Sequence, residues 1–131
     1  YIADTGNYRI RKIDIATGII NTIAGYNSVF SGDGGLAINA RFISPYKLEL
    51  DTSDNLYIQD SSRIRKIDVA TGIINTVAGT DLTSFNGDGQ KANVTNFYPS
   101  DFNIDKTGAL FIAEQNNRRV RKVFITPQIQ P

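Results

Sequence analysis

The chain has 131 residues, of which 40% are hydrophobic, and its 14 basic and 13 acidic side chains leave a formal net charge of +1. That length suits one domain, and this ordinary composition argues against intrinsic disorder. No apolar run approaches the roughly 20 residues of a membrane-spanning helix. The chain has no cysteine, so no disulfide pattern indicates its redox compartment.

The strongest feature is a repeat: residues 9–25 and 63–79 share one seventeen-residue sequence, apart from two exchanges of isoleucine for valine. Each copy predicts a β-hairpin, because two β-rich runs flank a short polar turn. The turn begins at an aspartate that can accept backbone N–H groups and ends at a glycine that can adopt a positive φ. These turn residues are Asp14 and Gly18 in the first copy and Asp68 and Gly72 in the second.

Other β-rich runs extend the pattern, and the apolar residues of a run do not keep to one face. Ile10 and Ile13 have opposite parity, which predicts strands covered on both sides and therefore stacked sheets. A helical turn is also predicted within residues 36–42, and left-handed turn residues at Asn55 and Gly108. In chain order, the predicted strands are residues 1–4, 9–13, 19–24, 46–50, 56–59, 63–67, 73–78, 102–104, 111–114 and 119–123.

The strands recur with a period of about 54 residues, four to a unit, which we label a to d in chain order. Such a radial repeat predicts an all-β fold, a β-propeller of four-stranded antiparallel blades. Residues 1–25 supply strands b to d of one blade, 45–79 a complete blade, and 99–131 strands a to c plus a tail. These are about two and a half blades, and a closed ring needs at least about four. We therefore expect part of a longer chain, or copies that associate to close the ring.

Several segments resemble the NHL repeat: residues 1–13, the Gly-Asp-Gly-Gly loop at 32–35, residues 54–58 and the ending at 77–79. The resemblance covers nearly the whole chain and implies a propeller, most often of six blades. It implies several possible functions: RNA binding, protein docking in ubiquitin ligases, extracellular adhesion of the teneurin type, and a metal-dependent amidating lyase. The long glycine-aspartate loops look more like the teneurin-type and microbial surface members, which favours an extracellular or cell-surface location.

In this family strand a usually lines the central channel, where small residues are common. This chain instead has Lys47 and Asp101 at equivalent positions of successive units. We expect their charged atoms to pair, the alternative being that both side chains point to water.

Basic residues recur on the c strands and would line up around a ring. One reading is a phosphate-binding stripe for RNA. The alternative, which the small net charge favours, is pairing with the acids that end the b strands, Asp4, Asp60 and Glu114. The candidate nucleic-acid-binding residues are Arg11, Lys12, Arg65, Lys66, Arg121 and Lys122.

Two glycine-aspartate loops could wrap a cation or form tight turns. Each offers only one carboxylate, so we expect turns, no bound metal and no cofactor. The chain has no histidine and no cysteine, so it lacks the parts of a lyase-type metal site and of a His-assisted nucleophile, and we expect no catalytic residues. The turn residues are Gly32, Asp33 and Gly34, and Gly87, Asp88 and Gly89.

Aromatic residues beside the connections could anchor a protein partner, although such rings more often cap the seam between blades. One N-glycosylation acceptor begins at Asn93. We conclude that the sequence best fits a non-enzymatic binding or adhesion scaffold with a protein partner. An RNA-binding propeller is the alternative, and an enzyme completed by other blades is the least favoured. The candidate anchors are Tyr8, Tyr26, Phe30, Phe85, Phe97 and Tyr98.

Overall fold

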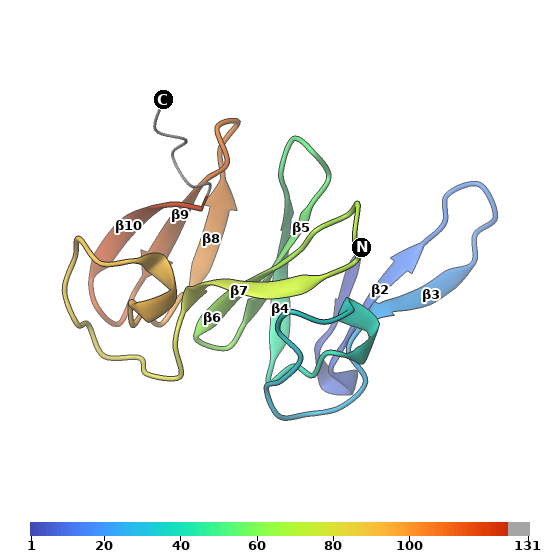
Figure 1. Cartoon of the computed structure of the whole chain (residues 1–131), viewed down its shortest axis with the longest axis horizontal. Coiled ribbons are helices and arrows are strands. Elements are labelled where there is room, and N and C mark those ends of the chain that lie inside the picture. The colour runs from blue at the N-terminus through green and yellow to red at the C-terminus, as the bar shows by residue number, and fades with distance from the viewer. Residues whose placement is uncertain (126–131) are drawn as a thin grey trace.

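The computed structural model describes residues 1–125, and it is all-β (Figure 1). Single 3₁₀ turns lie at Thr5–Asn7 (η1), Ala37–Asn39 (η2) and Ala92–Val94 (η3). Residues 126–131, at the end of the predicted third blade and its tail, lie outside the described residues. The strands are β1 (Ile2–Asp4), β2 (Arg9–Ile13), β3 (Ile20–Ala24), β4 (Pro45–Leu50), β5 (Leu56–Asp60), β6 (Arg63–Ile67), β7 (Ile74–Gly79), β8 (Asp101–Ile104), β9 (Ala109–Glu114) and β10 (Arg119–Phe124).

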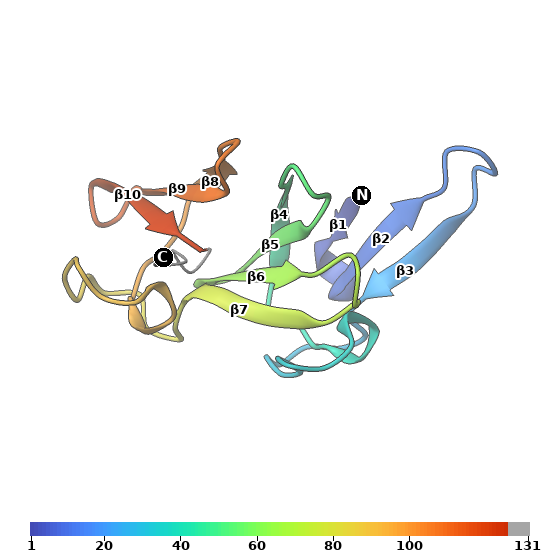
Figure 2. The same cartoon turned by 45° about the horizontal axis from the view of Figure 1, so that its top comes forward.

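These strands form three antiparallel sheets that follow the predicted repeat. The middle sheet has the order β4-β5-β6-β7, the first has β1-β2-β3, and the third has β10-β9-β8. Figures 1 and 2 show the three sheets side by side, with the middle one between the other two. This arrangement is consistent with part of a β-propeller, with four strands in the complete unit.

The two copies of the repeat fold alike at their turns. Gly18 and Gly72 adopt φ values of 74° and 73°, and Asp14 and Asp68 accept backbone N–H groups, as expected. One turn differs from expectation, because Asp54 and not Asn55 takes the left-handed conformation, with a φ of 63°.

Two hydrophobic clusters fill the two seams between the sheets. Ile67 belongs to the cluster between the first and middle sheets, and Ile64 to the cluster between the middle and third sheets. The middle sheet is therefore covered on both faces, as the parity of Ile10 and Ile13 predicted for such strands, whereas Ile13 itself is 46% exposed on the first sheet. Burial on both faces stabilises the fold because each fully buried aliphatic side chain contributes about 1.5–3 kcal/mol.

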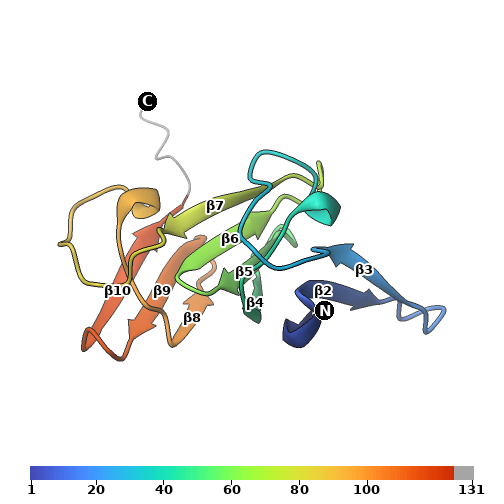
Figure 3. The same cartoon turned by 90° about the horizontal axis from the view of Figure 1, so that it is seen from below.

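The connection between β3 and β4 follows the outer edge of the middle sheet. The N–H of Gly34 donates to the carbonyl of Ile74 over 2.8 Å, and the N–H of Ile74 donates to the carbonyl of Gly35 over 3.0 Å. Figure 3 shows this connection passing beside β7 and carrying η2, which confirms the predicted helical turn. The connection thus covers an edge strand that would otherwise leave backbone groups unpaired.

No helix among residues 1–125 is long and apolar enough to cross a membrane.

Candidate functional site

The arginine at the centre of β6 is completely buried and is held by the preceding connection. The guanidinium of Arg65 donates to the carbonyls of Arg41 and Ser31 over 2.7 and 2.9 Å, and to Asp33 Oδ1 over 2.9 Å. Asp60 Oδ2 lies 3.6 Å from Arg65 Nη1. Asp33 stands two residues after Ser31 in the glycine-aspartate loop, so the loop closes directly over the guanidinium.

The third sheet repeats this arrangement around Arg121. Its guanidinium donates to the carbonyls of Asn96 and Gly87 over 3.1 and 2.6 Å, and its Nη2 lies 2.9 Å from Asp88 Oδ1. Glu114 Oε2 lies 3.6 Å from Arg121 Nη1. We call each set, an arginine with its strand-b acid, its loop aspartate and two loop carbonyls, an arginine clamp.

The acid at the end of strand b also fixes the connection itself. Asp60 Oδ1 accepts the backbone N–H groups of Ile43 and Ser44, both over 2.8 Å. Burial raises the pKa of Asp60, and these N–H groups and Arg65 act in the opposite direction. Pairing of strand-b acids with basic residues, expected from the sequence, is thus found at Asp60 and Glu114.

Two of the expected nucleic-acid-binding residues, Arg65 and Arg121, are the arginines of these clamps. Arg65 has no exposed side-chain surface and Arg121 only 10%, so neither is free to neutralise a phosphate. The lysines that follow the c-strand arginines instead lie over aromatic rings of the b strands. Lys12, Lys66 and Lys122 place their Nζ atoms 5.3, 5.7 and 5.3 Å from the ring centres of Tyr1, Tyr57 and Phe111.

The candidate aromatic anchors separate into three groups. Phe97 is 1% exposed within the second seam, so it is a core residue and not a surface anchor, which corrects the expectation. Phe30 and Phe85 cover the clamps, since their ring centres lie 4.7 Å from Arg65 Cζ and 5.1 Å from Arg121 Cζ. The last group, Tyr8, Tyr26 and Tyr98, retains exposed surface.

The glycine-aspartate loops are turns with positive φ at Gly32, Gly34, Gly87 and Gly89. Their aspartates bond to arginines across the fold, whereas the sequence suggested backbone N–H partners. Among residues 1–125 no group of three or more acidic side chains could hold a metal ion. Asn93 is exposed in η3, while the Thr95 hydroxyl donates to the carbonyl of Lys91 over 2.8 Å; glycosylation of Asn93 stays a prediction.

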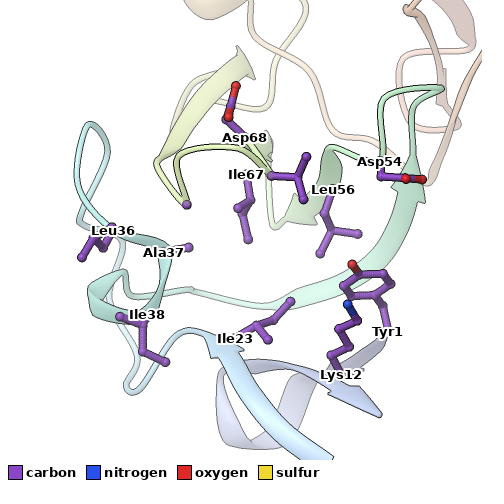
Figure 4. Close-up of a pocket in the computed structure, with 12 residues that line it drawn as sticks. Tyr1, Lys12, Ile23, Leu36, Ala37, Ile38, Asp54, Leu56, Ile67 and Asp68 are labelled. Atoms are coloured by element: carbon purple, nitrogen blue, oxygen red, sulfur yellow. The ribbon is translucent and has the colours of Figure 1, made fainter. Parts of the chain in front are cut away.

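A pocket of about 310 Å³ opens between the first and middle sheets (Figure 4). Figure 4 shows Leu56 and Ile67 on one side facing Ile23 on the other, with Leu36 and Ile38 of the connection closing one end. The surface is therefore mainly aliphatic and suits an apolar group. Nothing in the sequence spacing of these residues distinguishes a pocket wall from a core position.

Polar and charged side chains lie at the margin of this pocket. Lys12 and Tyr1 enter from the first sheet, and Asp54 and Asp68 come from turns of the middle sheet. Such a margin can orient a polar end of a ligand whose apolar part enters the cavity.

Comparison with known proteins identifies the family. The family model described as the Teneurin NHL domain matches residues 14–86, more than half of the chain. The chain belongs to the Teneurin NHL domain family. This membership confirms the NHL resemblance read from the sequence.

Relatives of this teneurin-type NHL chain are much longer proteins. It is 30% identical over 132 aligned positions to Protein SUPPRESSOR OF QUENCHING 1, chloroplastic, of Arabidopsis thaliana. The aligned region covers 94% of this chain and 12% of that relative. It is 34% identical over 98 residues to Teneurin-3 of Mus musculus, covering 64% of the chain and 4% of the relative. The teneurin-type NHL chain thus spans a small part of each.

Two solved structures share the fold of this NHL chain. One is a protein of unknown function from Bacteroides thetaiotaomicron, with a TM-score of 0.76 and 31% identity over 93% of the chain and 31% of that protein. The other, with a TM-score of 0.64 and 20% identity, is an auxiliary nutrient binding protein from Bacteroides ovatus, of which the chain covers 32%.

Proposed function

We propose that this protein is a non-enzymatic binding or adhesion scaffold, and that an apolar group of its partner enters the pocket between the first and middle sheets. Membership of the Teneurin NHL domain family supports a binding role, because adhesion is one of the functions that the resemblance to teneurin-type NHL repeats implies. The pocket carries the finer proposal: its volume of about 310 Å³ lies at the lower end of ligand sites, which hold about 300–1,000 Å³.

We further propose that the three sheets are blades of a six-bladed ring that further repeats complete. We assign residues 1–25, 45–79 and 99–125 to these three blades. The arginine clamps support this role, because they tie each connection to the sheet that follows and leave a rigid frame for variable loops.

A fluorescent apolar probe, 1-anilinonaphthalene-8-sulfonate, tests the pocket. We expect saturable binding that Leu36→Asp weakens about tenfold, because a carboxylate in the aliphatic wall must be desolvated when the probe enters. Leu36 is 51% exposed, so the substitution should leave the fold intact.

The matched control is Leu82→Asp. Leu82 is 63% exposed and lies in another connection, outside the pocket lining. We expect this variant to bind the probe as the parent does. Equal binding by all three proteins would place the probe on other exposed apolar surface and would contradict the proposed pocket.

A further inference from the structure

The outer face of the first sheet carries exposed copies of residues that are buried in the middle sheet. Ile13 and Ile20 are 46% and 37% exposed, whereas Ile67 and Ile74, at the same places of the seventeen-residue repeat, are 8% and 0% exposed. In the middle sheet, the first sheet and the connection beside β7 cover these two isoleucines. The first sheet therefore presents the same apolar face without its cover.

Among residues 1–125, Arg11 on this face also lacks the loop partners that hold Arg65 in the middle sheet. Arg11 occupies the repeat position of Arg65, and its Nε is buried without a hydrogen-bond partner. Within residues 1–125 its guanidinium makes no hydrogen bond or ion pair, while Asp4, at the position of Asp60, accepts only the side-chain amide of Asn7. Arg11 and Asp4 thus occupy the clamp positions of the arginine and the strand-b acid, without the loop carboxylate or the loop carbonyls.

The two complete clamps show which loop residues supply the contacts that Arg11 lacks. In both, a phenylalanine covers the arginines and an aspartate three residues later bonds to the guanidinium: Phe30 with Asp33, and Phe85 with Asp88. The glycine after Asp33 then pairs with the edge of β7. The shared sequence of the two loops is Phe-x-Gly-Asp-Gly.

We propose that Arg11 and the outer face of β2 and β3 bind a Phe-x-Gly-Asp-Gly loop of a further repeat of the same protein, outside these 131 residues. The aspartate would bond to Arg11, the ring would cover Arg9 and Arg11, and the following glycines would pair with the edge of β3 at Ile20. The negative loop matches the unpaired positive charge, and burial of Ile13 would add apolar contact.

The source follows from the state of the loops in this chain. Asp33 and Asp88 are already bound to Arg65 and Arg121, so a second copy could supply a loop only by breaking one of its own clamps. A further repeat carries no such penalty. This chain covers only 31% of the solved relative at TM-score 0.76, so the rest of that protein is long enough to contain further repeats.

The test adds a peptide with the sequence of residues 27–44 to the isotope-labelled 131-residue chain and follows backbone amide shifts by NMR. We expect saturable shifts at Arg11 and Ile20. The Asp33→Asn peptide should bind about tenfold more weakly, because it loses a charge-assisted hydrogen bond. Arg11→Gln in the protein should cause the same loss, with no further loss when both changes are combined.

A peptide with Asn39→Ala is the control and should bind unchanged, since Asn39 is exposed and is not one of the clamp residues. The proposal is overturned by no saturable shift at millimolar peptide, by equal binding of the Asp33→Asn peptide, or by shifts confined to Ile74. Concentration-dependent shifts at Arg11 and Ile20 without peptide would instead identify a second copy as the occupant and would overturn the proposed source.

Discussion

Lys47 Nζ on β4 lies 3.3 Å from Asp101 Oδ1 on β8, so one ion pair joins equivalent positions of neighbouring sheets. Glu49 of the same strand contributes a second carboxylate 3.2 Å from the lysine. A hydrogen bond to Glu49 and the neighbouring Asp101 raise the pKa of Lys47. The pairing confirms the expectation drawn from the sequence and shows that β4 and β8 meet through a polar contact.

Replacing Asp101 with asparagine should lower the free energy of unfolding by less than about 1 kcal/mol, because its side chain is 64% exposed and such pairs are weakened by solvent. The effect should shrink further at about 1 M salt, where charges are screened within a few ångströms. Urea denaturation at low and high salt measures it, with Lys47→Gln and the double variant completing the cycle. A coupling energy that does not change with salt would contradict this account.

Gly79 occupies a place that no side chain fits. Its φ is 92°, and a Cβ there would collide with the carbonyl oxygen of Ser62 and lie 2.9 Å from Phe97 Cζ. We expect Gly79→Ala to cost about 3 kcal/mol, the sum of left-handed strain and overpacking. Gly18→Ala is the matched control: its φ is 74° and its Cβ would meet no atom within 4 Å.

The control should lose only the conformational part, about 1–2 kcal/mol. Thermal or urea unfolding of both variants provides the comparison. Equal losses would show that the close approach of Ser62 and Phe97 is not what requires glycine at position 79.

The twin isoleucines of the repeat should respond differently to the same substitution. Ile74→Ala removes a completely buried side chain and should cost about 2–5 kcal/mol, since it leaves a cavity in the first seam. Ile20→Ala changes the same local sequence where the residue is 37% exposed, and it should cost at most about 1 kcal/mol in the 131-residue chain. Chemical denaturation measures both losses. A larger loss for Ile20→Ala than for Ile74→Ala would contradict the burial of Ile74 and the exposure of Ile20.

Asp60 should make stability depend on pH in a defined direction. Burial raises the pKa of Asp60 above its ordinary value of 3.8, so the folded protein holds this proton to higher pH than the unfolded chain. The contribution of Asp60 to the free energy of unfolding therefore falls as pH rises from 3.8 through the raised pKa.

Asp60→Asn removes this titration. Across a pH series of urea denaturations, the stability of the parent relative to the variant should decrease with rising pH and then level off. A difference that grew with pH would mean that the ion pair with Arg65 outweighs desolvation and lowers the pKa of Asp60.

Much of the fold could be predicted from local patterns. The period, the four-strand order of the complete unit and the turns at Gly18 and Gly72 follow from β-rich runs, Thr-Gly endings and a repeated sequence, because these features act over a few residues. The candidate site was predicted less well. Phe97 is a core residue, and the pocket at Ile23 and Leu56 has no sequence signal, because its walls come from separate sheets.

The sequence by itself determined the hairpin, and it did so twice with nearly the same residues. Only the tertiary structure decided that Arg65 is buried in a clamp while Arg11 has no loop partner among residues 1–125, and that Ile74 is buried while Ile20 is 37% exposed. The physical reason is that strand formation and turn geometry depend on neighbouring residues, whereas burial depends on what packs against a strand. For the middle sheet that cover comes from a loop some thirty residues earlier and from the sheet beside it.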